Sequence, residues 1–246
     1  LDGPEEDEFL LTLTFYSATV AMIFPYIGAL DAYARFDDGG LDDRLKRRVM
    51  RFYKRCVQRT LYLNGSDKIH LSKNPMFSGK VRALLEVFPD ARFVVLMRNP
   101  YETIPSILKM MSRNWKASDC SRELIAESLE AMGRQSIYSY LHPREVLGER
   151  STTPWMYVRY EELVERPLDV VAGVYARCDI PLPQRARLKL EEEQRRNRDY
   201  RAEHIYSLEE FGLGYSEIRA ALAPLFEEFR WPSPEGSVRD SPAPAV

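Results

Sequence analysis

Cysteine and histidine are scarce in this sequence. The 246 residues include three of each, and Cys56, Cys120 and Cys178 lie far apart without a Cys-x-x-Cys pair. Zinc-binding domains and disulfide-stabilised secreted domains both need clustered or regularly spaced cysteines. We therefore expect neither, and the scarcity of cysteine favours a cytoplasmic protein.

A large excess of charge of either sign is also absent. The 35 lysine and arginine residues oppose 37 aspartate and glutamate residues, which leaves a formal net charge of −2. This balance excludes a globally basic nucleic-acid binder, so we predict no nucleic-acid partner. With 45% hydrophobic residues, residues 1–231 are predicted to form a single domain, and the Pro- and Ser-rich residues 232–246 a disordered tail.

A signal-peptide pattern is missing too, and because the first residue is Leu1 we expect the chain to be cut from something longer. Charged residues are absent from residues 9–30, a stretch long enough to cross a membrane. Its Thr, Ser and Tyr residues, its internal Pro25 and the acidic residues just before it favour a buried helix instead. We therefore predict no membrane span in this chain.

Residues 41–62 predict an amphipathic helix that stops at Asn64-Gly65. Apolar residues recur on one face at helical spacing, and the other face is strongly cationic, with Arg44, Arg47, Arg48, Arg51, Lys54, Arg55 and Arg59. Like charges four positions apart repel each other. Either this face is simply solvated, or it attracts a phosphate-bearing or acidic ligand.

From residue 68 onward, short apolar runs alternate with helical patterns. Strands are predicted at 68–72, 92–97 and 155–160, the second of them fully buried. Helices are predicted at 79–88, 101–112, 121–140, 167–177, 184–198 and 215–230. This alternation is typical of an α/β fold, in which parallel strands form an open sheet flanked by helices.

Two of the predicted strands end in a cation. Arg98 follows the run FVVLM, and Lys73 follows the run KIHLS. In open parallel sheets, ligands bind beyond the carboxyl ends of the strands. Asn99 suits the cap and Pro100 the first turn of the next helix, so that the Ser106 hydroxyl and the Arg98 guanidinium could reach one phosphate. The pattern predicts an anion site, unless Arg98 pairs with a nearby carboxylate.

The segment Ser78-Gly79-Lys80 looks like the end of a Walker A loop, but the other residues of that motif are missing. Asn74 stands in place of the first glycine and Val81 in place of the final Ser or Thr. We therefore predict no phosphate-binding loop at this position.

Four segments in this order resemble the sulfotransferases, in particular the group related to heparan and tyrosylprotein sulfotransferases: HLSKNP, FPDARFVVLMRNPYETIPS, YEELVERP and HIYSLEEFGL. The resemblance extends from about residue 4 to about residue 231. It implies a P-loop-like open parallel sheet and 3'-phosphoadenosine 5'-phosphosulfate (PAPS) as the sulfuryl donor. It also implies adenosine 3',5'-bisphosphate as the product, and no metal.

The resemblance further implies roles for individual residues. Arg98 and Ser106 would bind the 3'-phosphate of PAPS, and Lys73 would lie beside the sulfuryl group and help the bridging oxygen to leave. Tyr160, Tyr206 and Ser207 resemble family residues that lie near the nucleotide. The family's first strand and its glycine-containing loop, of the RSGTT type, have no counterpart here and are expected upstream of Leu1.

The implied reaction is in-line transfer of a sulfuryl group to a hydroxyl or amine of a small-molecule, carbohydrate or peptide acceptor, assisted by a general base. Glu6 and Glu8 are candidates for this base, although the same acids could simply favour a helix N-terminus. His70 is expected to be packed or hydrogen-bonded rather than catalytic. His142 is expected in a surface turn, and His204 either meets the nucleotide or closes a loop.

Two other functions stay open from the sequence. A nucleotide or small-molecule kinase on a related fold would need a true Walker A loop upstream and Mg²⁺. A non-catalytic binding protein would lack the glycine loop in its natural gene. The sequence does not predict an oligomeric state, and if the protein is eukaryotic the expected compartment is the Golgi lumen.

Overall fold

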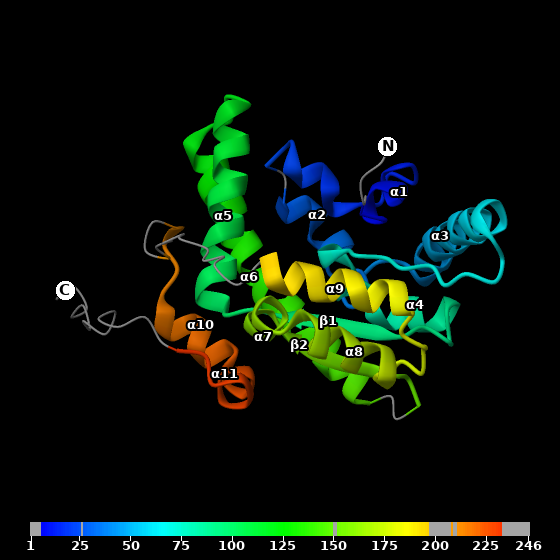
Figure 1. Cartoon of the computed structure of the whole chain (residues 1–246). Helices are drawn as coiled ribbons and strands as arrows, with labels where there is room; N and C mark the ends of the chain where they lie inside the picture. Colours follow the sequence, from blue (N-terminus) through cyan, green and yellow to red (C-terminus); the bar gives the residue numbers. More distant parts are fainter. Residues whose placement is uncertain (1–5, 26, 150–151, 197–207, 209–210, 233–246) are drawn as a thin grey trace.

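The structure is a computed structural model that describes residues 6–25, 27–149, 152–196, 208 and 211–232. It is mostly helical, with a small sheet at its centre (Figure 1). Two short segments, η1 (Ala18–Met22) and η2 (Pro75–Lys80), are 3-10 helices. The α-helices are α1 (Glu8–Thr12), α2 (Ile27–Ala34), α3 (Asp43–Asn64), α4 (Val81–Val87), α5 (Pro100–Ala117), α6 (Arg122–Gly148), α7 (Tyr160–Glu165), α8 (Pro167–Arg177), α9 (Gln184–Arg196), α10 (Tyr215–Ala221) and α11 (Ala223–Phe229).

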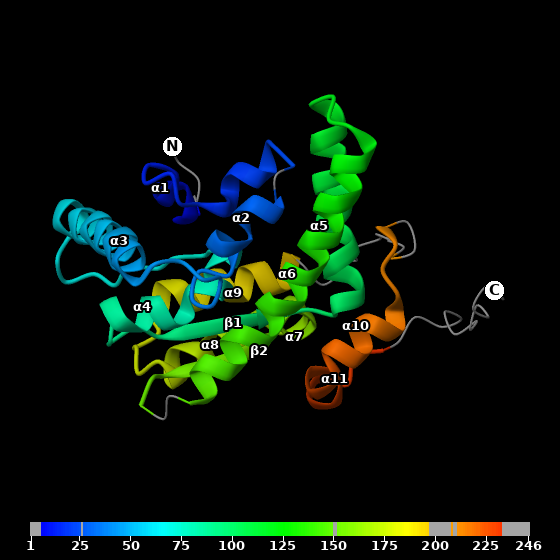
Figure 2. The same cartoon turned by 180° about the vertical axis from the view of Figure 1, so that it is seen from behind.

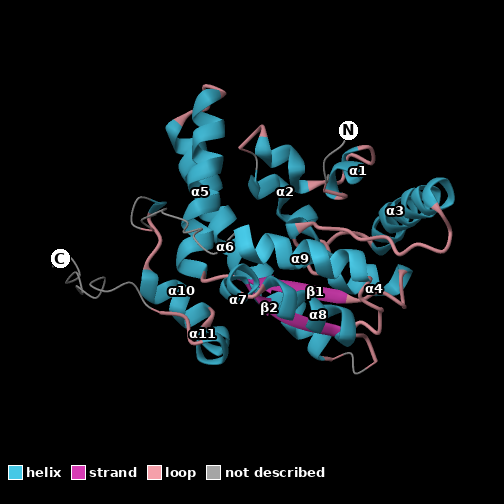
Figure 3. Ribbon diagram, viewed as in Figure 1, coloured by secondary structure: helices cyan, strands magenta, loops and turns pink. Residues whose placement is uncertain are grey.

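Two parallel strands, β1 (Phe93–Met97) and β2 (Trp155–Arg159), form the sheet of the described residues (Figure 3). Their register pairs Phe93 with Trp155 and Met97 with Arg159. The opposite views of Figures 1 and 2 place α8 and α9 on one side of the sheet and α4 and α6 on the other. The predicted α/β class, the parallel pairing and most helix positions are therefore confirmed.

Residues 68–72, expected as a strand, form a loop instead (Figure 3). A strand exists only where its backbone hydrogen bonds find a neighbouring strand, and in the described sheet β1 and β2 pair only with each other. Ile69 and Leu71 are consequently 61% and 91% exposed. The pattern identified strand-type residues here, but a strand also needs a partner.

The expectation that β1 is fully buried is wrong as well. Met97 is 2% exposed, whereas Val94 and Leu96 are 45% and 54% exposed. Alternate residues of a strand point to opposite faces of the sheet, and the helices on the face that carries Val94 and Leu96 leave these two side chains uncovered. Parallel strands become fully buried only where both faces are covered.

The charge-free stretch at residues 9–30 is divided among α1, η1 and α2, so the expectation of one buried helix is wrong. Phe15 adopts a left-handed backbone with a φ of 63°. Ser17 is extended and caps η1 by accepting a hydrogen bond from the Thr19 amide. Leu11 is buried, but Leu13 and Phe15 are 70% and 87% exposed. Among the described residues, no helix combines the length and the apolar character that crossing a membrane requires.

The helix predicted at residues 41–62 is confirmed as α3. Asp42 begins it by accepting a hydrogen bond from the Leu45 amide, and Gly65, with a φ of 125°, ends it. The buried residues of α3 pack against α1 and α4 and include Val49, Met50, Tyr53 and Val57. A second and larger core lies around Trp115 of α5 and joins α6, α10 and α11.

Candidate nucleotide site

Arg98 is held at the carboxyl end of β1. Its carbonyl oxygen accepts a hydrogen bond of 2.8 Å from the Tyr140 hydroxyl on α6. Burial raises the pKa of Tyr140 above its usual range, which keeps this donor protonated. The Arg98 guanidinium lies 4.6 Å from the ring centroid of Tyr160, the residue that follows β2. The ends of the two strands thus bring together two residues that the family resemblance places at the nucleotide site.

Glu102 binds the Arg98 guanidinium, so the carboxylate partner considered from the sequence is present. The Nε and Nη2 atoms of Arg98 donate to Glu102 Oε2 at 3.0 and 2.8 Å. The two side chains are 32% and 48% exposed, and exposed ion pairs of this kind contribute at most about 1 kcal/mol. A phosphate can compete with so weak a partner. From the sequence we considered a nearby carboxylate without naming Glu102, which lies four residues after Arg98.

Asn99 and Pro100 begin α5 as predicted. The Asn99 side chain accepts a hydrogen bond of 3.0 Å from the Tyr101 amide, and Pro100 is the first residue of the helix. The amide end of α5 therefore lies directly beyond β1, where a helix favours an anion. Ser106 is half-buried in the second turn of α5. Its contact with the same anion as Arg98 stays a prediction.

Lys73 forms an ion pair with Glu6, so the predicted leaving-group cation and one candidate base are adjacent. The Lys73 side chain is 72% exposed and that of Glu6 is 31% exposed. The next residue, Asp7, anchors this segment: its Oδ2 accepts a hydrogen bond of 2.6 Å from the Tyr53 hydroxyl and lies 2.7 Å from His70 Nε2. Burial, and then Asp7, raise the pKa of Tyr53. His70 is therefore hydrogen-bonded, as expected.

Glu8, the other candidate base, is buried against Lys80. The Lys80 Nζ lies 3.2 Å from Glu8 Oε2, and the two side chains are 0% and 1% exposed. Ser17 donates a hydrogen bond of 2.8 Å to Glu8 Oε1, and Lys80 also donates to the carbonyl oxygens of Tyr33 and Met76. An acceptor arriving from solvent reaches Glu6 more easily than Glu8. The sequence had singled out Lys80 only for its place in a failed Walker motif.

His142 does not lie in a surface turn, which corrects the sequence expectation. It is part of α6, its side chain is 0% exposed, and its Nε2 and Nδ1 lie 2.8 and 3.1 Å from carboxylate oxygens of Asp37 and Asp38. These two acids come from the loop after α2, which no local pattern connects with α6. Within the described residues, no group of three or more His, Cys, Asp or Glu side chains is arranged to hold a metal ion.

Three further candidate residues lie outside the described residues: His204, Tyr206 and Ser207. They were expected near the nucleotide or, for His204, alternatively in a closing loop.

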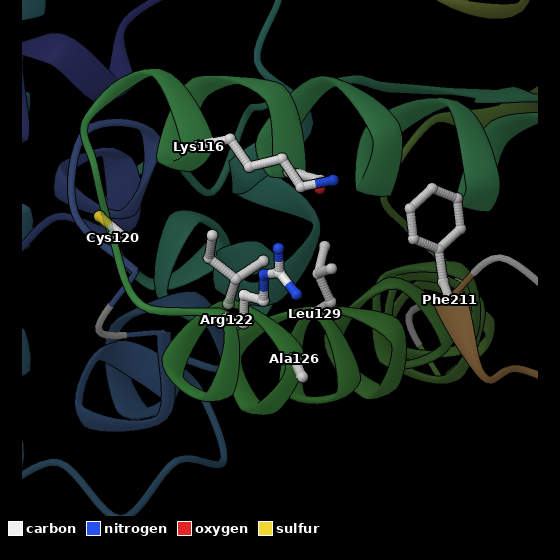
Figure 4. A pocket seen from close by; sticks show the side chains of 8 residues that line it. Lys116, Cys120, Arg122, Ala126, Leu129 and Phe211 are labelled. Atoms are coloured by element: carbon white, nitrogen blue, oxygen red, sulfur yellow. The ribbon is translucent and has the colours of Figure 1, made fainter.

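A hollow of about 540 Å³ lies between α5 and α6 (Figure 4). Lys116 and Arg122 extend over it, and Phe211 lies at one end. Its lining residue Ser112 is roughly 18 Å from Pro100 along α5, at 1.5 Å per residue. This hollow is therefore separate from the strand end that carries Arg98.

Comparison with known proteins gives a family and a set of relatives. A family model described as the sulfotransferase family matches residues 2–184. Two curated relatives are 25% identical over 183 residues, namely the omega-hydroxy-beta-dihydromenaquinone-9 sulfotransferases Stf3 of Mycobacterium bovis and of Mycobacterium tuberculosis. The match covers 71% of this chain and 45% of each relative. The matched part thus spans less than half the length of these relatives.

A solved structure of a sulfotransferase has a similar fold. The sulfotransferase STF9 from Mycobacterium avium superposes with a TM-score of 0.76 and 22% identity. The superposition covers 92% of this chain and 56% of the STF9 chain. The likeness confirms the P-loop-like α/β fold that the family resemblance implied.

Proposed function

This chain belongs to the sulfotransferase family, and from that premise we propose that it transfers a sulfuryl group from PAPS to a hydroxyl group of an acceptor. The observation that carries the proposal is Arg98 at the end of β1, beside the Tyr160 ring and the first turn of α5. A cation and a helix N-terminus at one strand end suit a phosphate. Because the matched part spans under half the length of the curated relatives, the proposal concerns the whole protein.

Each residue of the proposed site has one task. When bound, PAPS supplies the sulfuryl group: its bond between sulfur and the bridging oxygen breaks as the acceptor oxygen binds sulfur. Glu6 takes the proton from the acceptor hydroxyl, and Lys73 offsets the negative charge that develops on the departing 5'-phosphate. Arg98 and Ser106 hold the 3'-phosphate. The remaining proposed contacts with the nucleotide come from Tyr160, Tyr206 and Ser207.

The acceptor that we propose is a lipid alcohol, rather than a carbohydrate or a peptide. The curated relatives are named for a hydroxylated menaquinone. Large apolar side chains are also exposed in the segment that follows Glu6, where a hydrocarbon chain would find contacts: Phe9, Leu13, Phe15, Val20, Met22 and Ile23. The relatives are bacterial, so we retain the cytoplasm as the proposed compartment and not the Golgi lumen.

The donor site is tested by calorimetric titration of adenosine 3',5'-bisphosphate into this chain. Adenosine 5'-monophosphate, which lacks only the 3'-phosphate, should bind far more weakly. Arg98→Ala should weaken binding of the bisphosphate by roughly ten- to a hundredfold, because it removes charge-assisted hydrogen bonds. Ser106→Ala should weaken it by roughly three- to tenfold. Arg113→Ala, an exposed arginine on the same helix, is the matched control and should bind normally.

Two outcomes would contradict the proposal. If neither this chain nor the whole protein bound the bisphosphate, the sulfotransferase site would be absent. If ADP with Mg²⁺ bound tightly and the bisphosphate did not, the kinase alternative would replace it.

Sulfuryl transfer is measured by incubating the whole protein with PAPS that carries a label in its sulfuryl group. A polyprenyl alcohol should become labelled, and a monosaccharide or a tyrosine peptide should not.

A further inference from the structure

We propose that the arginine face of α3 is a docking site for an anionic lipid surface. The arginine face consists of Arg44, Arg47, Arg48, Arg51, Arg55 and Arg59, all of them exposed. This inference goes beyond the sulfuryl transfer proposed above and does not depend on it, because docking requires neither PAPS nor an acceptor.

The arginine face is a continuous stripe on the outside of the molecule. Five of its residues follow one another at steps of three or four positions, which aligns them along one side of a helix. From Arg44 to Arg59 the stripe is roughly 22 Å long at 1.5 Å per residue. Figures 1 and 2 both show α3 at the edge of the molecule opposite α10 and α11. A stripe of this length suits an extended anionic surface better than a single small anion.

The charge of the arginine face is not neutralised by the protein. Within the described part of the chain, no salt bridge involves any of the six arginines, and Arg51 donates only to the carbonyl oxygen of Arg47. The two lysines of α3 are used elsewhere, since Lys46 donates to the Asp37 carbonyl and Lys54 to the Val87 carbonyl. Arginines four positions apart repel one another. An external anionic partner relieves that repulsion, which supplies the charge complementarity for docking.

The apolar face of α3 is unable to enter a bilayer, because it packs against α1 and α4 within the core. This distinguishes α3 from an ordinary amphipathic surface helix, which inserts its apolar face. Two exposed apolar residues nevertheless follow the stripe: Tyr62 and Leu63 are 85% and 80% exposed. Tyrosine at the end of a cationic stripe suits the headgroup region of a membrane. For this reason we infer a lipid surface and not a nucleic acid.

The experiment is flotation of the protein with vesicles of phosphatidylcholine alone and of phosphatidylcholine with phosphatidylglycerol. We expect binding to the second kind only, falling steeply as salt rises. The triple variant Arg48→Gln, Arg51→Gln, Arg55→Gln should bind on the order of a hundredfold more weakly, since each arginine near an anionic surface contributes about a fivefold factor. The double variant Tyr62→Ser, Leu63→Ser should bind several-fold more weakly with the same dependence on salt.

The matched control is Arg185→Gln, Arg187→Gln, Lys189→Gln, which removes three exposed cations from α9. It should bind anionic vesicles as the unmodified chain does. Equal loss in this control would show that net charge and not the arginine face is responsible, and would overturn the proposal. Equal binding to both kinds of vesicle would overturn it too. So would tighter binding of an RNA oligonucleotide that depends on the same arginines.

Discussion

At the scale of single residues, Glu8 and Lys80 show how burial makes two opposite charges depend on each other as a structural ion pair. Both side chains are withdrawn from solvent, and an isolated charge in such a place is strongly disfavoured. Each therefore requires the other. The hydrogen bonds of Lys80 to the carbonyl oxygens of Tyr33 and Met76 add further partners. The pair connects α1 to η2 and is better suited to structure than to proton transfer.

Removing one partner of this pair should destabilise the protein. Glu8→Gln should lower the free energy of unfolding by about 3–5 kcal/mol, because Lys80 would remain buried without a counter-charge. Urea denaturation followed by circular dichroism measures this. The matched control is Glu130→Gln: Glu130 pairs with Arg134 on the surface at 69% and 65% exposure, and its loss should change stability by less than about 1 kcal/mol. Equal effects of the two substitutions would show that burial of Glu8 is not what makes it important.

At the scale of elements, α2 and η2 approach each other through their backbones at Gly79. A Cβ atom added at Gly79 would lie 1.9 Å from the carbonyl oxygen of Ala34. The Gly79 carbonyl also accepts a hydrogen bond of 3.0 Å from the Asp37 amide. The glycine in the failed Walker motif is thus required by packing, and it positions the loop that carries Asp37.

The substitution Gly79→Ala should therefore be destabilising. Separating α2 from η2 to fit the methyl group should lower the free energy of unfolding by about 1–3 kcal/mol. Gly173→Ala in α8 is the comparison, because a Cβ there meets nothing within 4 Å and alanine favours a helix by about 1 kcal/mol. Thermal unfolding should show opposite shifts for the two variants. If Gly79→Ala instead raised the free energy of unfolding, the backbones of α2 and η2 would not approach each other as closely as described.

At the scale of the whole molecule, four tyrosines with buried or half-buried side chains limit stability at high pH. Burial is the main cause of the raised pKa of Tyr53, Tyr138 and Tyr140, and it raises the pKa of Tyr157 to about 12. In the unfolded chain each hydroxyl titrates near pH 10. Below that pH both states keep the proton. Above it the unfolded state loses protons that the folded state retains, so the free energy of unfolding falls as pH rises.

Urea denaturation from about pH 8 to about pH 11 tests this sign. We expect the urea concentration at the midpoint of unfolding to stay constant up to about pH 10 and then to decrease. Tyrosinate absorbance should show the exposed tyrosines titrating near pH 10 in the folded protein, and the buried ones only as it unfolds. A constant midpoint across this range would contradict the burial of these hydroxyls.

What the sequence determined by itself rests on local signals. Asn99 with Pro100 begins α5, Gly65 ends α3, and the run before Arg98 forms a strand, because caps, turns and periodicity act through neighbouring residues. The parallel arrangement followed from strand and helix alternation. The candidate site residues followed from strand ends and from family resemblance.

Only the tertiary structure decided which of these residues are buried or paired. Residues 68–72 carry a strand pattern, yet no described strand lies beside them. Glu8 and His142 look like surface residues in sequence and are enclosed by Lys80 and by Asp37 and Asp38. Pairing and burial depend on partners that are distant along the chain, and periodicity or capping carries no information about them.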